Sequence, residues 1–227
     1  GDSERARTEE ELALTLAEEI GDRELQSDAL NNLANNFYTT GNFERSRALH
    51  ERNLALRLSL GRRRGIADTL VNLGEVARVR HDLPAALDYT QRALAIYEQL
   101  GLKRYLANTH LQMATIVRDQ GDLAGALARL NAGFALAATI DSQGLAANYH
   151  REFVALHEAR GDWRAAFESQ RKLAAANDAV LGEKTRTQLA AYSARYDAER
   201  RQQEIALLHG DRARQEAELR AKGCDWI

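Results

Sequence analysis

A short turn returns along this chain at a constant interval of 40 residues. In each copy a Gly, or once a His, precedes Asp or Asn and then a bulky apolar residue. The copies are Gly41-Asn42-Phe43, His81-Asp82-Leu83, Gly121-Asp122-Leu123 and Gly161-Asp162-Trp163. A fixed period between about 20 and 50 residues is typical of stacked-repeat proteins. The chain is therefore predicted to be a repeat array.

Apolar residues keep the same register on either side of the turns. The columns are Leu30 and Leu70; Leu33, Leu73, Met113 and Phe153; Leu54, Leu94 and Phe134; and Leu60, Leu100, Ile140 and Val180. The stretches between turns have helical periodicity and no strand-type runs, so an all-α fold is expected. Helix pairs are predicted at 24–39 and 43–60, 63–80 and 83–100, 103–120 and 123–140, and 143–160 and 163–181.

The first amphipathic segment, 9–20, ends near Gly21 and aligns with the second half of the following repeat. It is therefore expected to be a half repeat whose first half is absent, in a chain that starts and stops within its structure. Residues 1–182 are predicted to form the array. Its units are the half repeat 9–20 and the repeats 21–60, 61–100, 101–140 and 141–181.

The turn residues explain why each pair should be a helical hairpin. Gly supplies the left-handed conformation that ends the first helix, so the turn at His81 is expected to be either slightly strained or differently shaped. The N-caps of the next helices, each worth about 1 kcal/mol, are predicted to be Asn42, Asp82, Asp122 and Asp162. Pro84 lies in a first helical turn, where it is tolerated. Close helix contacts are expected at Ala48, Ala86, Ala126 and Ala166.

Several function classes are disfavoured by composition and spacing. The net charge of −2 leaves no excess of basic residues for a nucleic-acid interface. Cys224 is the single cysteine, so an internal disulfide and a cysteine metal site are excluded. His110 and His150 share a column, but no third ligand completes a metal site. No catalytic set or phosphate loop is recognised, so no catalytic residue, metal or cofactor is predicted. Aromatic residues expected to pack in the core are Tyr89, Tyr97, Tyr105, Phe134 and Trp163.

The pattern of Leu70, Leu73, Gly74, Ala86 and Ala93 resembles the tetratricopeptide repeat (TPR), in its 40-residue variety. The usual helix-ending Pro is missing, and Gly133 and Val154 depart from the usual residues. The resemblance implies a right-handed superhelix of antiparallel helix pairs. It also implies a scaffold for protein–protein interaction, with the first helix of each pair lining a concave groove.

That resemblance implies a peptide- or protein-binding groove. Its candidate residues are Asn31, Asn35, Tyr38, Asn72, Glu75, Arg78, Asn108, Arg118, Asn148 and Arg151. An Asn side chain carries a donor and an acceptor, so a row of them can pair with an extended peptide backbone. Asn35 and Asn72 occupy two positions of the family's carboxylate clamp, but its Lys and Arg are absent, so chaperone C-termini are not expected. The alternative is that the Asn residues are solvated or bond between neighbouring helices.

The remaining residues, 183–227, break the period and are predicted to form one long, charged connector helix. A short coiled-coil seam indicates a parallel homodimer. Its residues are Leu189, Tyr192, Tyr196, Ile205 and Leu208. The alternative is a solvated helix that only covers the last repeat.

Residues 194–208 resemble the connector that follows TPR sensors in membrane-bound bacterial signalling proteins. Such sensors precede a GGDEF-type diguanylate cyclase or, less often, a histidine kinase. The resemblance implies a non-catalytic sensory module on the periplasmic side of the inner membrane, signalling through its C-terminal helix. The alternative is a cytoplasmic peptide-binding regulator or assembly scaffold.

Overall fold

The computed structural model describes residues 2–140, 142–182, 201 and 205, and all regular structure in them is helical. The helices are α1 (Asp2–Glu19), α2 (Arg23–Thr39), α3 (Phe43–Ser59), α4 (Arg63–Val79), α5 (Leu83–Leu100), α6 (Lys103–Asp119), α7 (Leu123–Ala138) and α8 (Gln143–Ala159). A further helical segment follows at 163–182. In this described part, no helix is both long and apolar enough to cross a membrane. The all-α prediction is confirmed.

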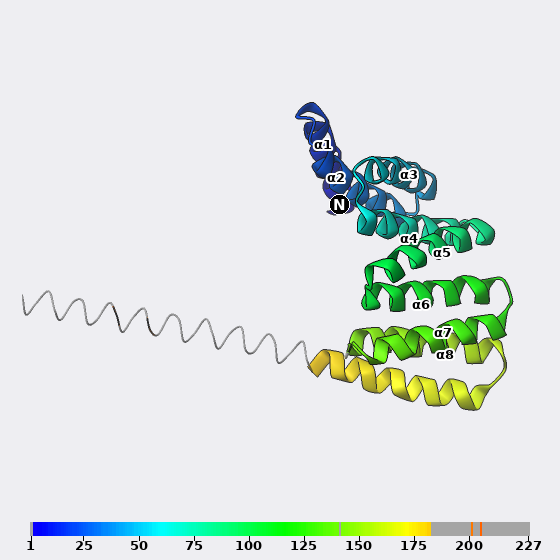
Figure 1. The fold of residues 1–227 in the computed structure, drawn as a ribbon. Coiled ribbons are helices and arrows are strands. Elements are labelled where there is room, and N and C mark those ends of the chain that lie inside the picture. Colours follow the sequence, from blue (N-terminus) through cyan, green and yellow to red (C-terminus); the bar gives the residue numbers. More distant parts are fainter. Residues whose placement is uncertain (1, 141, 183–200, 202–204, 206–227) are drawn as a thin grey trace, which may run out of the picture. The chain divides into compact units, whose positions relative to one another are not determined.

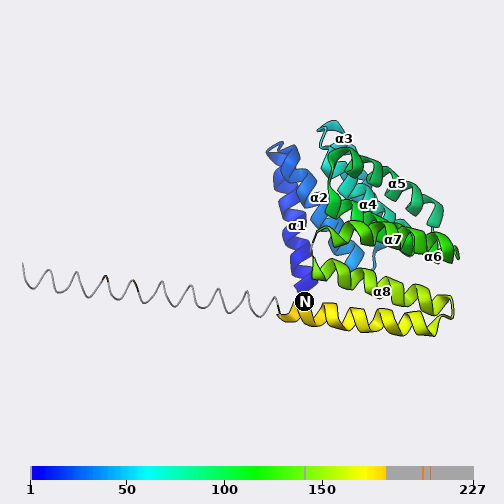
Figure 2. The same ribbon diagram turned by 60° about the horizontal axis from the view of Figure 1, so that its bottom comes forward.

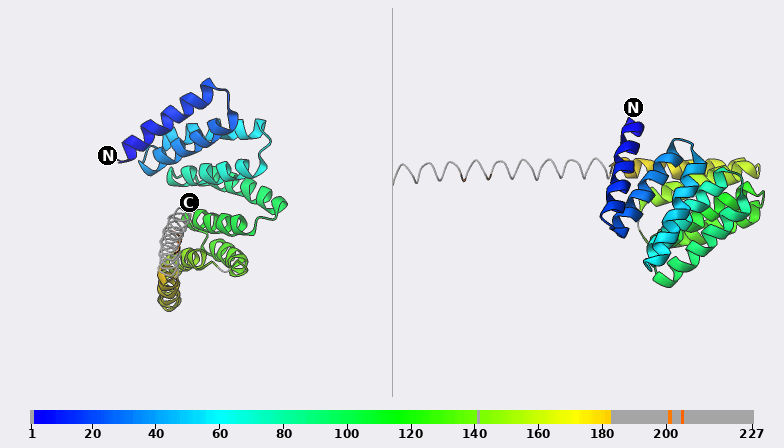
Figure 3. Two further views of the ribbon diagram at one scale, coloured as in Figure 1. Left: turned by 90° about the vertical axis from the view of Figure 1, so that its left-hand side faces the viewer. Right: turned by 90° about the horizontal axis from the view of Figure 1, so that it is seen from above.

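The chain forms two compact units, 1–176 and 177–227, and α1 to α8 all lie in the first. Within that unit each helix packs on its neighbours in sequence, as Figures 1 and 2 show for the successive hairpins. Two further views show the same order (Figure 3). Contacts also join α4 to α6 and α6 to α8. The first helices of successive pairs therefore lie side by side.

The turns have the predicted geometry. Positive φ angles occur at Gly41, Gly121 and Gly161, and also at His81, where φ is 61°. His81 is the only non-glycine residue with positive φ in the described part of the chain. Such a conformation costs an L-residue roughly 1–2 kcal/mol. The strain expected at this turn is therefore present.

Side-chain caps begin the second helix of each pair. Asn42 accepts a hydrogen bond from the Arg45 amide at 3.2 Å, and Asp82, Asp122 and Asp162 do the same for the amides three residues on. The four predicted N-caps are therefore confirmed.

One position in the predicted column of close contacts was wrong. Ala48 is exposed, whereas Ser46 is fully buried. Ser46 lies 40 residues before Ala86, and Ala48 lies two residues further on, which turns its side chain about 200° round the helix. The buried column therefore reads Ser46, Ala86, Ala126 and Ala166.

Helix α1 begins at Asp2, earlier than the predicted start at residue 9. The added turns carry an ion pair between Arg5 and Glu9 at 3.1 Å, four residues apart. Such a pair supports a helix by about 0.2–0.5 kcal/mol. The apolar pattern used for the prediction begins after these charged turns, which explains the difference.

Trp163 is 69% exposed, so the prediction that it packs in the core is wrong. Its counterpart in the first repeat, Phe43, contacts the Tyr38 ring, with the centroids 5.6 Å apart. The residue equivalent to Tyr38 before Trp163 is Glu158, which offers no ring. The missing neighbour leaves Trp163 in solvent.

Gly133 departs from the repeat pattern because a tyrosine occupies the space of its side chain. A Cβ atom on Gly133 would lie 1.9 Å from Tyr149 Oη, which no repacking of a buried ring tolerates. That hydroxyl donates a hydrogen bond to the Ala107 carbonyl at 2.6 Å. The glycine therefore admits a contact that joins α6, α7 and α8.

Candidate partner-binding face

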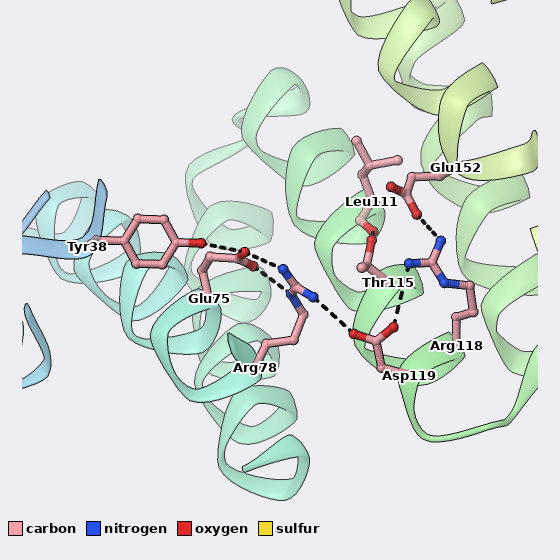
Figure 4. A network of polar contacts seen from close by, with 8 residues as sticks. All are labelled: Tyr38, Glu75, Arg78, Leu111, Thr115, Arg118, Asp119 and Glu152. Carbon is pink, nitrogen blue, oxygen red and sulfur yellow. Dashed lines mark hydrogen bonds and ion pairs between the residues drawn. The ribbon is translucent and has the colours of Figure 1, made fainter. Parts of the chain in front are cut away.

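A row of hydrogen bonds and ion pairs joins polar side chains from the first helix of each pair (Figure 4). It begins on α2, crosses α4 and α6, and ends on α8. We name it the polar ladder. Its members are Tyr38, Glu75, Arg78, Arg118, Asp119 and Glu152.

Glu75 and Arg78 form the centre of the polar ladder, on α4. Tyr38 Oη donates to Glu75 Oε1 at 2.9 Å. Arg78 holds both carboxylate oxygens of Glu75, with Nε 3.0 Å from Oε2 and Nη2 2.6 Å from Oε1. Its Nη1 donates to Asp119 Oδ2 on α6 at 3.0 Å. A two-point guanidinium–carboxylate pair fixes orientation as well as charge.

Arg118 continues the polar ladder to α8. Its Nη1 donates to Glu152 Oε2 at 2.6 Å, and its Nη2 lies 3.6 Å from Asp119 Oδ1. Three carboxylates against two guanidiniums leave one net negative charge. Both guanidiniums are engaged, so the polar ladder offers a partner no unpaired cation.

The pKa values of these groups are shifted in the directions that keep the polar ladder intact. Burial, and then the Glu75 carboxylate, raises the pKa of Tyr38 to about 12, so its hydroxyl stays a donor. Burial raises the pKa of Glu75, but the hydrogen bonds and charge of Arg78 outweigh it and hold that pKa below its ordinary value. The hydrogen bond to Glu75 raises the pKa of Arg78. All three keep one protonation state around neutral pH.

The structure brings four of the ten predicted binding residues into the polar ladder and leaves the other six beside or beyond it. Asn72 Nδ2 donates to Asn31 Oδ1 at 3.3 Å, which joins α4 to α2. Arg151 Nη1 donates to Asn148 Oδ1 at 2.9 Å within α8. Asn35 and Asn108 are exposed. Carboxylates on neighbouring helices hold both of the predicted arginines at positions 78 and 118.

Sequence reasoning missed Asp119 and Glu152, the carboxylates that join the arginines to α6 and α8. The signal available was the alternation of basic and acidic residues on neighbouring first helices. Without the helix orientations, that alternation did not distinguish paired from solvated charges.

A pocket of about 230 Å³ opens beside Tyr38 and Glu75, between α2 and α4, with α3 behind them. Four of the predicted residues line it together: Asn35, Tyr38, Asn72 and Glu75. The complete lining is Asn35, Tyr38, Thr39, His50, Asn72, Glu75 and Val76. His50 was missed from the sequence. We name this space the His50 pocket.

A second polar network lies inside the first repeat. Ser27 Oγ on α2 donates to Asn53 Oδ1 on α3 at 2.8 Å, and Arg57 Nε donates to Ser27 Oγ at the same distance. Arg57 Nη1 reaches α4, where it donates to the Gly65 carbonyl at 2.8 Å and to Thr69 Oγ1 at 2.9 Å. This network ties the three helices around the His50 pocket together.

His50 is 1% exposed, and its burial, followed by the charge of Arg57, lowers its pKa to about 4. The imidazole is therefore neutral at pH 7. A neutral imidazole has one nitrogen that donates and one that accepts, so it serves either kind of ligand atom.

The histidine column at positions 110 and 150 lies elsewhere, toward α7 and α8. His150 packs on the Phe134 ring at 5.2 Å between centroids and, with His157 and Phe153, lines a pocket of about 260 Å³. Across the described residues, no group of three or more His, Cys, Asp or Glu is placed to hold a metal ion. Burial, and then Lys172, lowers the pKa of His150.

We predict that Arg78→Met lowers the free energy of unfolding by about 1–2 kcal/mol, because it leaves the half-buried Glu75 and Asp119 carboxylates without their partner. Arg92→Met is the matched control. Arg92 pairs with Asp88 at 3.2 Å, but both side chains are more than half exposed. Its loss should change stability by less than about 0.5 kcal/mol. Urea denaturation followed by circular dichroism measures both, and equal losses would contradict the role given to the polar ladder.

We also predict a pH dependence of stability that originates at His50. The unfolded chain binds a proton at its imidazole below its ordinary pKa of 6.5, whereas the folded chain does so only near pH 4. This contribution to stability is therefore complete above pH 6.5 and is lost as the pH falls from there to about 4, on the order of 3 kcal/mol.

His50→Leu should remove that part of the acid loss, since Leu130 occupies the equivalent place in the third repeat. His81→Asn, at an exposed turn, is the control and should keep the wild-type profile. Urea midpoints measured between pH 7 and pH 4 compare the three proteins. Parallel profiles for the wild type and His50→Leu would show that His50 is not the titrating group.

Several solved structures resemble the chain in fold. BtubC (BKLC) from P. vanneervenii has 19% identity and a TM-score of 0.68, over 80% of this chain and 76% of that one. A Signal Transduction ATPase with Numerous Domains with a tetratricopeptide repeat sensor, from Pyrococcus horikoshii, has 18% identity and a TM-score of 0.64, over 80% and 29%. A Rap protein complexed with Competence and Sporulation Factor has 14% identity and a TM-score of 0.58, over 80% and 60%.

The sequence itself matches a known repeat. No curated protein matches the chain. Residues 27–60, which span α2 and α3, and residues 65–139, which span α4 to α7, each match the tetratricopeptide repeat. These two segments are therefore tetratricopeptide repeats, and the chain contains a tetratricopeptide-repeat protein-interaction domain.

Proposed function

We propose that this domain binds an extended segment of a partner protein along the face formed by α2, α4, α6 and α8. The observation that carries the proposal is the shared pocket of Asn35 and Asn72, at one end of the polar ladder. Each Asn amide offers a donor and an acceptor. These groups can pair with the main chain of an extended segment whatever its sequence. The Rap protein solved with Competence and Sporulation Factor supports the proposal, because a related fold there holds a ligand.

The charges on this face favour an uncharged stretch of the partner. Arg78 and Arg118 are held by carboxylates, and one negative charge remains over the polar ladder. A terminal carboxylate would meet no unpaired guanidinium in the polar ladder and would be repelled by Glu75. The main chain of an internal segment avoids this repulsion.

The double change Asn35→Ala plus Asn72→Ala tests the proposal. A random peptide library displayed on phage would be selected against the wild-type chain, and the best synthetic peptide titrated by fluorescence anisotropy. Loss of two side-chain hydrogen-bonding groups, at about 1 kcal/mol each, should weaken binding roughly 10- to 30-fold.

Gln91→Ala plus Arg92→Ala is the control pair, on the exposed face of α5. It should bind the peptide as the wild type does. Equal affinity for the peptide in the Asn35→Ala, Asn72→Ala protein would mean that these amides do not hold the partner.

We further propose that the domain is the sensory input of a bacterial signalling protein on the periplasmic side of the inner membrane, with a diguanylate cyclase as effector. Two things support this: the resemblance of residues 194–208 to the connectors of such proteins, and the sensor role named for the repeats of the similar ATPase from Pyrococcus horikoshii. A partner would act by binding one arrangement of the repeats better than another. A cytoplasmic regulator or scaffold is the alternative.

This second proposal requires a homodimer through the C-terminal helix. Of its seam residues, Ile205 is helical and 53% exposed. The others, Leu189, Tyr192, Tyr196 and Leu208, lie outside the described residues. Light scattering should give twice the chain mass of 25.3 kDa for residues 1–227 and a monomer for residues 1–182. Monomers in both cases would favour the scaffold alternative.

A further inference from the structure

The interior of the first repeat differs from that of its neighbours. The buried residues of α3 are all polar: Ser46, His50 and Asn53. At the equivalent places, 40 and 80 residues further on, the chain has Ala86, Thr90 and Ala93, and then Ala126, Leu130 and Gly133. Thr90 satisfies its hydroxyl within its own helix, by donating to the Ala86 carbonyl at 2.8 Å. The third repeat therefore shows that the packing of the array does not need polar groups here.

The polar groups of α3 are also left partly unsatisfied. Ser46 Oγ, His50 Nδ1 and Asn53 Nδ2 are buried and have no hydrogen-bond partner among the described residues. An unsatisfied buried donor or acceptor costs about 1–3 kcal/mol. The three residues lie at spacings of four and three, so they share one face of the helix. His50 brings that face to the wall of the His50 pocket.

The size of the His50 pocket fits one side chain. At about 230 Å³, it has room for roughly seven waters at about 30 Å³ each, far more than one bridging water. It is smaller than the roughly 300–1,000 Å³ of pockets that hold drug-sized ligands. A single residue of a bound segment is the natural occupant by volume.

Charge excludes ionic occupants. Both oxygens of Glu75 already accept hydrogen bonds from Tyr38 and Arg78, so the carboxylate has its countercharge. A cation would have to compete with Arg78 and would lie near Arg57, whose charge already lowers the pKa of His50. An anion would be repelled by the one net negative charge that remains on the polar ladder. The hydrogen-bonding groups that remain in the pocket are uncharged and include donors and acceptors, since Asn35 and Asn72 each offer one of each.

We propose that the His50 pocket binds a primary carboxamide, the side chain of an Asn or Gln residue in the bound partner. A carboxamide is uncharged and has two N–H donors and one carbonyl acceptor, which matches the Asn amides at the mouth and the imidazole on the wall. The inference deepens the proposed function by naming what one position of the partner must be. It rests on that function only in placing the partner on this face.

Capped single residues test the pocket without a peptide. The probes are N-acetyl-glutamine N-methylamide and its glutamate, lysine and methionine analogues, titrated into the 227-residue chain with ¹³C-labelled histidine rings. The His50 ring resonance should move and saturate with the glutamine probe, with at least 10-fold tighter binding than the other three. Free glutamine should bind more weakly than the capped form, because its two terminal charges find no partner in the pocket.

His50→Leu should abolish saturable binding of the glutamine probe, followed through backbone amide resonances, and Thr90→Val, the same register on α5, should preserve it. If His50→Leu does not fold by circular dichroism, Asn35→Leu at the exposed mouth should block binding instead. Equal binding of all four capped probes, no saturable shift at His50, or tighter binding of free glutamine would each overturn the proposal. Failure of the phage selection together with glutamine-probe binding would reject the extended-segment function and keep the pocket.

Discussion

The fold depends on each helix pair being unable to bury both of its faces alone. A pair becomes stable only when the next pair covers it, so the contacts that join neighbours decide the geometry of the whole array. The small residues of the buried column, such as Ala86 and Ala126, allow that close approach. Stacking in turn brings α4 beside α6 and α6 beside α8, which is what allows side chains 34 to 41 residues apart to bond in one row.

The same stacking separates structural from recognition roles on each first helix. Leu70 and Leu73 of α4 face the interior, while Glu75 and Arg78 lie in the row shared with α2 and α6. The charged groups of the polar ladder are stabilised by carboxylates and guanidiniums on adjacent helices as well as by solvent. Its arginines are therefore less available to a ligand than their number implies. Recognition is left to the amides and to the pocket beside them.

The fold could be predicted because the turn residues and the apolar columns repeat with one period. Agreement among the repeats therefore decided the fold, even where a single position was assigned wrongly. The Gly turns, the four N-caps and the helix pairs followed from that repetition. The errors fell where one repeat differs from another. Ala48 was placed two residues out of register, and Trp163 lacks the aromatic neighbour that Phe43 has. The pairing of Arg78 with Asp119 and the position of His50 at the wall of a pocket depend on helix orientations, which residue spacing does not give.

The buried polar face of α3 affects which part of the array unfolds first. Adjacent repeats are coupled, yet each contributes its own stability, so a solenoid opens first at its weakest unit. The pair of α2 and α3 buries the face of Ser46, His50 and Asn53 where the other pairs bury small or apolar groups. We therefore expect the amide hydrogens of this pair to exchange earliest among the inner helices, and a ligand in the neighbouring pocket to slow that exchange.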